Sequence, residues 1–188
     1  MICFVFVCGC NSQNKESKMT ELYDTLNCPI ISYEEYLGSP HEIKCYYDFY
    51  EGLKCSEISK KPYLVYFTGH GSVQARQMEV EVLSDKEIKK YIESEFVLAT
   101  LYVDDISIKL EKDKQIVSEI NGDTIKTYGL RQAYIEKQKF NDQKFPVFYI
   151  VDLNEQILAG PIYFDLDKNF FLDFLKEGKM NYNKQNDK

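Results

Sequence analysis

The sequence has few histidines and arginines and no Cys-x-x-Cys pair. None of its six cysteines lies beyond residue 55, and no two of them have Cys-x-x-Cys spacing. With only two histidines, His41 and His70, the chain lacks the four well-spaced ligands that a structural zinc site requires. We therefore expect no metal and no cofactor.

Acidic residues outnumber basic ones. The chain carries 23 basic and 30 acidic residues, for a net charge of -7, and only Arg76 and Arg131 are arginines. This balance argues against nucleic acid or an anionic membrane surface as a partner. No apolar run approaches the length of a membrane-spanning helix. The length of 188 residues and the hydrophobic content of 44% fit one globular domain with a sizeable core.

The first ten residues are apolar and give way abruptly to a polar stretch after Cys10. Val7-Cys8-Gly9-Cys10 resembles a bacterial lipobox, in which the last cysteine is lipidated and begins the mature protein. We predict a signal segment over 1–10, then a polar tether and short helix over 11–40. The protein would then lie on the periplasmic side of the cell envelope, touching a membrane only through its lipid. The alternative is translation from Met19 and a cytoplasmic product.

Apolar runs and capping residues predict the elements of the first half of the folded domain. They are, in order, a short helix over Ser32–Leu37, a helix from Asp48 to about Ser59, a strand over Tyr63–Phe67, a helix from Gly71 through Val82, a helix opened by the Ser84/Glu87 capping box, and a strand over Phe96–Val103. The strand–helix–strand order indicates a βαβ unit.

The second half begins with an insertion, in which Asn121-Gly122 favours a type I′ hairpin turn between Ile116-Val117 and Thr124-Ile125. The elements expected after it are a helix over Leu130–Phe140, a strand over Lys144–Asp152, a hairpin strand over Ile157–Gly160, a helix over Asp167–Gly178 and a polar tail over 181–188. A βαβ unit joined to a ββα unit predicts an α/β thioredoxin-like domain over 41–180, with a mixed sheet flanked by helices.

Several stretches carry a family resemblance. They are Lys61-Pro62, Phe67-Thr68-Gly69-His70-Gly71, Arg76-Gln77-Met78-Glu79, Ser84-Asp85, Leu101-Tyr102-Val103-Asp104-Asp105, Pro146, and Phe174-Leu175-Lys176-Glu177-Gly178. From about Pro40 to Asn181 the chain resembles the periplasmic thioredoxin-like C-terminal domain of the Bacteroidetes thiol:disulfide interchange (cytochrome c biogenesis) transmembrane proteins. In that family the turn typically reads Gly-Cys-Val-Asn-Cys-Arg-Lys-Met-Glu. Here Ser72 and Ala75 stand at the two cysteine positions, and the sequence contains no membrane bundle.

The resemblance also implies a binding groove. Pro146 aligns with the cis-proline of thioredoxin-like folds, and the residue before it, Phe145, would offer backbone groups to an extended substrate segment. We predict that Gly71, Ser72, Val73, Phe145 and Pro146 form a groove for an extended protein segment. The alternative is that Pro146 merely opens a strand.

Other candidate residues have simpler interpretations. Ser72 is expected to cap a helix rather than act as a nucleophile, because His70 lies too near in sequence for a productive Ser–His pair. Asp104-Asp105 is expected to be a solvated turn rather than a cation site. Cys28, Cys45 and Cys55 are small core residues or contribute one structural disulfide, and a displaced redox pair such as Cys45 with Cys55 stays open.

These observations favour a catalytically silent thioredoxin-like lipoprotein that binds a protein segment or envelope protein. The alternative is a periplasmic thiol:disulfide oxidoreductase, of use in redox homeostasis or cytochrome c maturation. It would act through other cysteines, or the sequence would be a substituted variant of an active parent. A third alternative is a structural subunit of a larger envelope complex. The sequence leaves the oligomeric state open.

Overall fold

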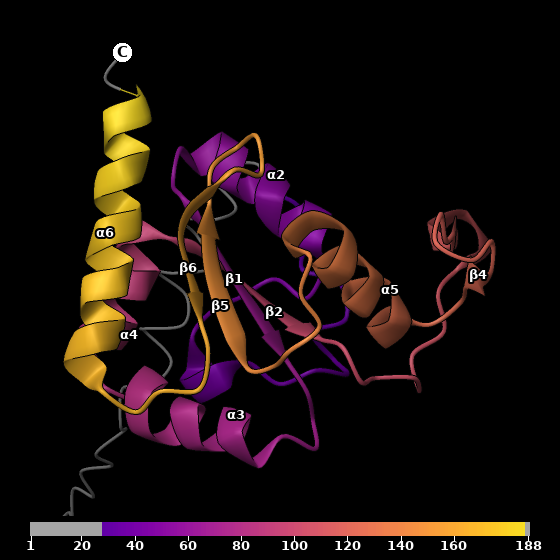
Figure 1. Cartoon of the computed structure of the whole chain (residues 1–188), viewed down its shortest axis with the longest axis horizontal. Helices are drawn as coiled ribbons and strands as arrows, with labels where there is room; N and C mark the ends of the chain where they lie inside the picture. Colours follow the sequence, from indigo (N-terminus) through magenta and orange to yellow (C-terminus); the bar gives the residue numbers. More distant parts are fainter. Residues whose placement is uncertain (1–27, 187–188) are drawn as a thin grey trace, which may run out of the picture.

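The computed structural model describes residues 28–186, and they are built around a four-stranded mixed sheet with the order β2-β1-β5-β6 (Figure 1). The central strand β1 (Tyr63–Thr68) pairs in parallel with β2 (Val97–Tyr102) and antiparallel with β5 (Val147–Val151). Strand β6 (Ile157–Ile162) pairs antiparallel with β5. The predicted α/β thioredoxin-like topology is confirmed. The predicted signal segment, Cys10 and most of the tether lie outside the described residues.

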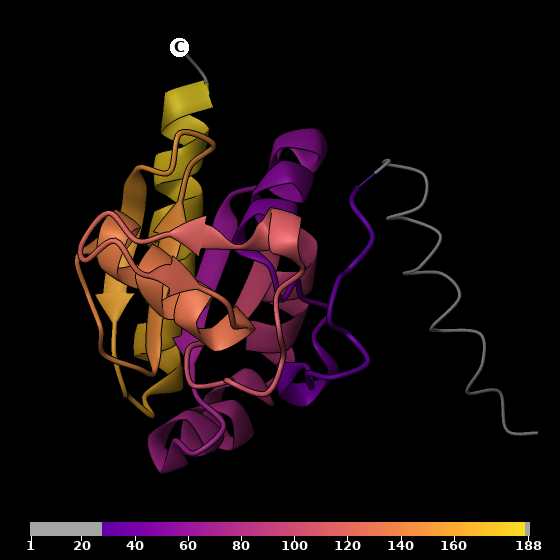
Figure 2. The same cartoon turned by 90° about the vertical axis from the view of Figure 1, so that its right-hand side faces the viewer.

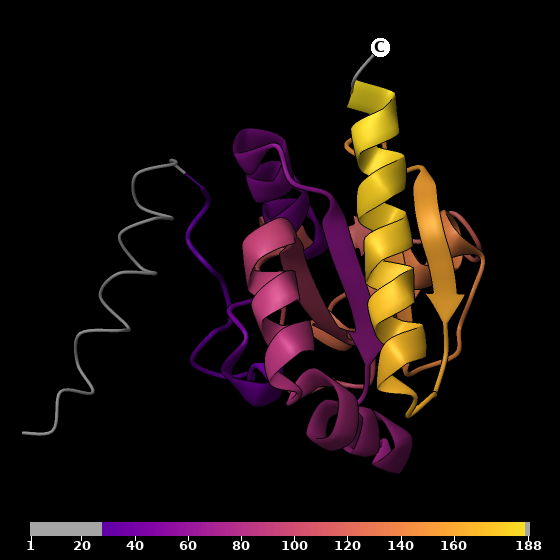
Figure 3. The same ribbon diagram turned by 90° about the vertical axis from the view of Figure 1, so that its left-hand side faces the viewer.

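Helices cover both faces of the sheet (Figures 1 and 3). One face is covered by α2 (Phe49–Ser59) and α5 (Tyr128–Ile135), and the other by α3 (Val73–Met78), α4 (Lys86–Glu95) and α6 (Lys168–Asn186). All residues of β1 and β2 are buried as a result, as expected for strands covered on two sides. None of the helices within residues 28–186 is both long and apolar enough to cross a bilayer.

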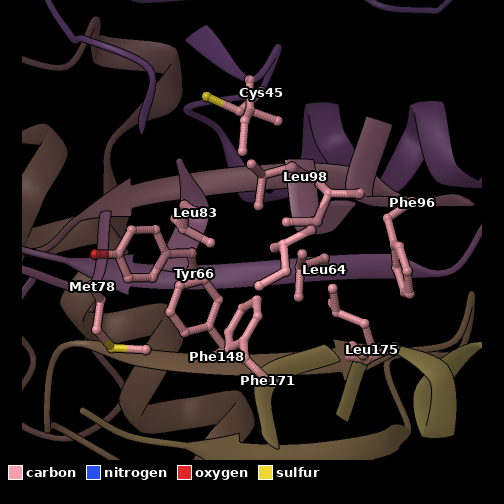
Figure 4. Close-up of a cluster of buried hydrophobic side chains, with 14 of the residues drawn as sticks. Cys45, Leu64, Tyr66, Met78, Leu83, Phe96, Leu98, Phe148, Phe171 and Leu175 are labelled. Atoms are coloured by element: carbon pink, nitrogen blue, oxygen red, sulfur yellow. The ribbon is translucent and has the colours of Figure 1, made fainter. Parts of the chain in front are cut away.

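Aromatic stacking fills the core between the sheet and α6 (Figure 4). The rings of Tyr66 on β1 and Phe148 on β5 stack with centroids 4.1 Å apart, and Phe171 of α6 meets Phe148 edge-on at 5.0 Å. Such pairs contribute about 0.5–1.5 kcal/mol beyond the burial of their area. The core therefore fixes α6 against the two central strands.

The predicted insertion is present. Strands β3 (Ile116–Val117) and β4 (Thr124–Ile125) form an antiparallel hairpin, with Gly122 at a φ of 75° in the turn. The hairpin lies beside α5 (Figure 2). Two short 3₁₀ turns are η1 (Pro40–Glu42) and η3 (Lys112–Lys114). Two π-helical turns, η2 (Glu79–Leu83) and η4 (Glu136–Phe140), follow α3 and α5.

Two predicted helix starts are wrong. The segment from Ser32 to Leu37 forms turns, because the backbone N–H and hydroxyl of Ser32 both donate to the Glu51 carboxylate, and Tyr33 adopts a positive φ. Helix α4 is capped by Asp85 rather than by Ser84. The Asp85 carboxylate accepts hydrogen bonds from the two free amides of the first turn, whereas the Ser84 hydroxyl donates to the Val80 carbonyl.

The last helix also runs further than predicted, because Gly178 does not end it. A Cβ atom at Gly178 would lie 2.3 Å from Cδ1 of Ile150 on β5. The glycine lets α6 approach the sheet closely, and the helix continues to Asn186 with Tyr182 buried. Part of the predicted polar tail is therefore helical.

Candidate functional site

The site lies at the turn between β1 and α3, and Ser72 is the N-cap residue of that helix. The Ser72 hydroxyl oxygen accepts a hydrogen bond from the Ala75 backbone N–H at 3.2 Å, as predicted for a helix cap. Ala75 is fully buried under the first turn. A reactive dithiol requires a thiolate at this helix end and a second thiol to resolve the mixed disulfide. The hydroxyl and methyl groups found here supply neither.

Asp104 holds the turn in place. Its two carboxylate oxygens accept hydrogen bonds from the backbone N–H groups of His70, at 2.9 Å, and Gly71, at 3.2 Å. A Cβ atom at Gly69 would lie 2.9 Å from the same carboxylate and 2.6 Å from the Phe145 ring. The turn is thus built to let a carboxylate and an aromatic ring approach its backbone closely.

Asp105 is likewise engaged rather than solvated. It is buried, and it lies 3.0 Å from Nε2 of His70 and accepts three hydrogen bonds from Ser107 and Ile108. Burial alone would raise the pKa of Asp105, but these hydrogen bonds, together with the contact to His70, outweigh it and lower that pKa. The prediction of a solvated turn at Asp104-Asp105 is correct for Asp104, which is exposed in a turn, and wrong for Asp105, which is buried. Within residues 28–186 no three potential ligands gather as a metal site.

The ring of His70 is fixed as well. It stacks on Tyr102 with centroids 4.2 Å apart and an interplanar angle of 14°. Among the described residues, no hydrogen bond joins His70 to Ser72. Serine catalysis needs a base within reach of the hydroxyl, and the His70 ring contacts Asp105 and Tyr102 instead.

The peptide bond between Phe145 and Pro146 is cis, as the resemblance implied. Pro146 directly precedes β5, and the pairing of Phe67 with Val147 brings this loop beside the end of β1. The structure therefore gathers the predicted groove residues at one end of the sheet: Gly71, Ser72, Val73, Phe145 and Pro146. Val73 is 73% exposed and Phe145 is 38% exposed, so both present apolar surface to solvent. Their role in binding stays a prediction.

Asp142 orders the approach to Pro146. It accepts hydrogen bonds from the hydroxyls of Tyr149, at 2.7 Å, and Tyr163, at 2.6 Å, and from the backbone N–H groups of Gln143 and Lys144. Burial would raise the pKa of Asp142, but the tyrosine hydroxyls and the two N–H groups lower it overall. Sequence reasoning missed this residue, because its partners lie up to 21 positions away.

A closed polar ring lies under α3. The guanidinium of Arg76 donates to the hydroxyl of Thr68, and the Thr68 hydroxyl donates to Tyr66. The Tyr66 hydroxyl donates to Glu79, which pairs with Arg76 at 2.7 Å. Burial raises the pKa of Glu79, and the contacts with Arg76 and Tyr66 only partly offset the shift. This ring ties the first turns of the helix to β1, and the sequence offered no sign of it beyond the Arg76–Glu79 spacing.

The three cysteines within residues 28–186 place no thiol pair at this turn. Cys28 and Cys55 form a disulfide, so the pairing of Cys45 with Cys55 is wrong, and Cys45 is a buried thiol. Burial raises the pKa of Cys45 to about 11, so it is not a thiolate at neutral pH. The disulfide joins the segment before η1 to α2. Gly52 of α2 packs on Tyr63, which is the first residue of β1, whereas the turn with Ser72 follows the last residue of that strand.

Comparisons with known proteins agree with this fold. No protein-family profile and no curated protein sequence matches the chain. A solved structure titled DsbH oxidoreductase superposes with a TM-score of 0.53 at 15% identity, over 77% of this chain and 90% of the other. A thioredoxin from Thermus thermophilus superposes with a TM-score of 0.51 at 19% identity, over 72% and 86%. At these identities the likeness shows a thioredoxin-like fold.

Proposed function

We propose that the protein is a catalytically silent thioredoxin-like module that binds an extended protein segment in the cell envelope. The observation that supports this proposal is the combination of an intact site shape with absent site chemistry. The turn, the cis-proline loop and the exposed Val73 and Phe145 lie together, while the helix begins with Ser72 and carries no thiol. A segment would dock between Val73 and Phe145 through apolar contacts and strand-like pairing near Pro146.

The cellular location is part of the proposal. Cys10 would carry a lipid that anchors the protein on the periplasmic side of a membrane. The disulfide between Cys28 and Cys55 supports this location, because disulfides persist in oxidising compartments. Mass spectrometry of the mature N-terminus from native membranes tests the anchor. An unmodified chain that begins at Met19 would contradict it.

The absence of oxidoreductase activity is tested with the insulin assay, which measures the rate at which a dithiol reduces insulin disulfides with and without the protein. We expect the wild-type rate to equal the uncatalysed rate. The double variant Ser72→Cys/Ala75→Cys should gain activity, because it places two thiols at the end of an intact helix. Wild-type activity that is sensitive to thiol alkylation would refute the proposal.

Binding at the groove is tested by capture of envelope proteins with the full chain. Val73→Asp places a charge in the groove, and Val117→Asp makes the same change at an exposed site on the β3–β4 hairpin. We expect Val73→Asp to lose bound proteins that Val117→Asp retains. Equal capture by both variants would move the binding surface away from the groove.

The oxidoreductase alternative is favoured by one observation, the bonded pair Cys28–Cys55. It predicts turnover in the insulin assay that disappears in a Cys28→Ser variant. Our proposal predicts no turnover in either protein, because Cys55 is fully buried and the pair lies at the far end of β1 from the cis-proline loop.

A further inference from the structure

A second groove, separate from the one at the cis-proline loop, runs along the edge of the sheet formed by β6 and lies between β6 and α6. It has a volume of about 440 Å³ and is lined by all six residues of β6. The helix contributes Phe170, Asp173, Phe174 and Glu177, whose spacing puts them on one helical face. Strand and helix lie side by side here (Figure 3).

The sheet edge at this groove is open. Within residues 28–186, β6 has β5 as its only strand partner. The opposite edge is different, because Tyr46 forms a parallel bridge to β2, with its backbone groups bonded to Leu98 and Thr100 at 2.8 Å each. A strand edge without such cover is a surface on which another chain can pack.

The groove combines exposed apolar side chains with acidic ones. Ile157 and Phe170 are 48% and 49% exposed, and the carboxylates of Asp173 and Glu177 are the charged groups of the lining. Neither carboxylate has an ion pair among the described residues. Two lysines of α6, Lys168 and Lys179, pair instead with Asp85 and Glu95 near α4. The two carboxylates at the groove are therefore not tied up by a partner within the described residues and can accept a basic group.

We propose that this groove binds an extended segment of a partner protein in which apolar side chains alternate with lysine or arginine. A strand of six residues spans about 20 Å, which sets the length of the bound segment. Apolar side chains would pack on Ile157 and Phe170, while the basic ones would face Asp173 and Glu177. A second copy of this chain fits less well, because it would bring another pair of carboxylates against the first.

Side-chain contacts carry most of this binding. Asn181 donates its amide N–H to the Leu158 carbonyl at 2.8 Å, so that backbone acceptor is already occupied. Pro161 has no N–H to offer. A complete backbone ladder along β6 is therefore excluded, and the affinity should fall as salt screens the charged contacts.

The test uses fluorescence anisotropy with the full chain and three labelled seven-residue peptides. One alternates lysine with valine, one alternates glutamate with valine, and one has the lysines and valines in two separate blocks. We expect the alternating basic peptide to bind at least tenfold more tightly than the other two. The variant Asp173→Lys/Glu177→Lys should lose at least tenfold in affinity for it. The matched control, Glu111→Lys/Glu119→Lys, makes the same charge change at exposed sites near the β3–β4 hairpin and should bind as the wild type does.

Three outcomes would overturn the proposal. Equal losses in the two lysine variants would mean that only net charge matters. A wild-type dimer in sedimentation velocity that dissociates in Asp173→Lys/Glu177→Lys would assign the groove to a second copy. Loss of the basic peptide in Val73→Asp, with retention in Asp173→Lys/Glu177→Lys, would assign the peptide to the cis-proline groove. These peptide-binding measurements do not depend on whether the groove at the cis-proline loop binds a protein segment.

Discussion

At the scale of single residues, Ser72 shows how one side chain stabilises the start of α3. Its hydroxyl accepts the Ala75 N–H, and so it satisfies one of the free amides at the start of α3. A cysteine sulfur is a much weaker acceptor than a hydroxyl oxygen. A serine therefore suits this helix start better than a cysteine would.

We predict that Ser72→Ala costs about 1 kcal/mol of unfolding free energy, because the cap is lost and nothing replaces it. Ser72→Asp should retain stability near the wild-type value, since its carboxylate also accepts from the amide and favours the helix N-terminus. Urea unfolding of the three proteins measures both effects. Equal stability of Ser72→Ala and the wild type would show that the cap contributes nothing.

Glu136 gives the chain a pH-dependent stability. The residue is 1% exposed, one of its carboxylate oxygens has no partner among the described residues, and burial together with the nearby Asp142 raises its pKa to about 8. An unfolded glutamate titrates near 4.3. The folded state thus holds the proton more tightly, and stability should fall as pH rises from about 4.3 to 8.

We expect Glu136→Gln to remove this part of the pH dependence, because glutamine is uncharged throughout the range. At pH 8 the stability of the variant relative to the wild type should be about 4 kcal/mol more favourable than it is at pH 4. Thermal unfolding of both proteins at several pH values makes the comparison. Parallel pH profiles would show that Glu136 does not titrate in this range.

At the scale of elements, Gly178 has a role that local propensity does not predict. Glycine in a helix interior usually destabilises it by about 0.5–1 kcal/mol relative to alanine. In α6 the opposite should hold, because a Cβ atom at this position would lie 2.3 Å from Ile150 Cδ1 and 2.9 Å from its Cγ2. Real Cβ atoms do not approach other atoms so closely, so α6 or Ile150 would have to move.

We predict that Gly178→Ala destabilises the protein by about 1–3 kcal/mol. Ile150→Val removes Cδ1, so the double variant Gly178→Ala/Ile150→Val should lose less than the sum of the two single losses. The control is Gly38→Ala, since a Cβ atom there meets nothing within 4 Å. Chemical denaturation gives all four values, and simple additivity would contradict the contact.

Local elements were predictable where neighbouring residues determine them. Asp48 caps α2 through the amides of Tyr50 and Glu51, and the hairpin around Asn121-Gly122 forms as expected. Its predicted type I′ turn is wrong, because Asn121 does not adopt a positive φ and residues 118–123 connect the paired strands. Ser32 failed as a cap because its partner, Glu51, lies 19 positions away. Gly178 failed as a helix end because Ile150 determines its role, and pairings of this kind depend on the tertiary fold.

The same division holds for the candidate site. Its residue types and the cis bond at Pro146 followed from motifs and from the resemblance. The carboxylates that support the site did not, because Asp104 and Asp142 contact residues from other parts of the chain. Their positions depend on the register of β1 with β2 and β5.

At the scale of the whole molecule, the first described residues form a strap across the α2 side of the domain. Cys28 is bonded to Cys55, Ser32 donates twice to Glu51, and the Tyr46 hydroxyl donates to the Pro29 carbonyl at 3.1 Å. Cys28 and Ile31 pack against the core cluster on this face. The strap thus closes the core that α2 and α5 cover.

The disulfide should contribute much of the stability of this strap. It closes a loop with a sequence separation of 27, for which the chain-entropy relation gives about 3–4 kcal/mol. We predict that a dithiol reductant lowers the melting temperature of the wild type. The Cys28→Ser variant should melt at the temperature of the reduced wild type, whether or not the reductant is present. The control is that the reductant does not change the melting temperature of Cys28→Ser. This variant retains Cys45 and Cys55, so any effect of the reductant on these thiols would still appear in it. A wild-type melting temperature that does not change, while mass spectrometry confirms reduced Cys28 and Cys55, would mean that the hydrogen bonds of Ser32 and Tyr46 hold the strap without the disulfide.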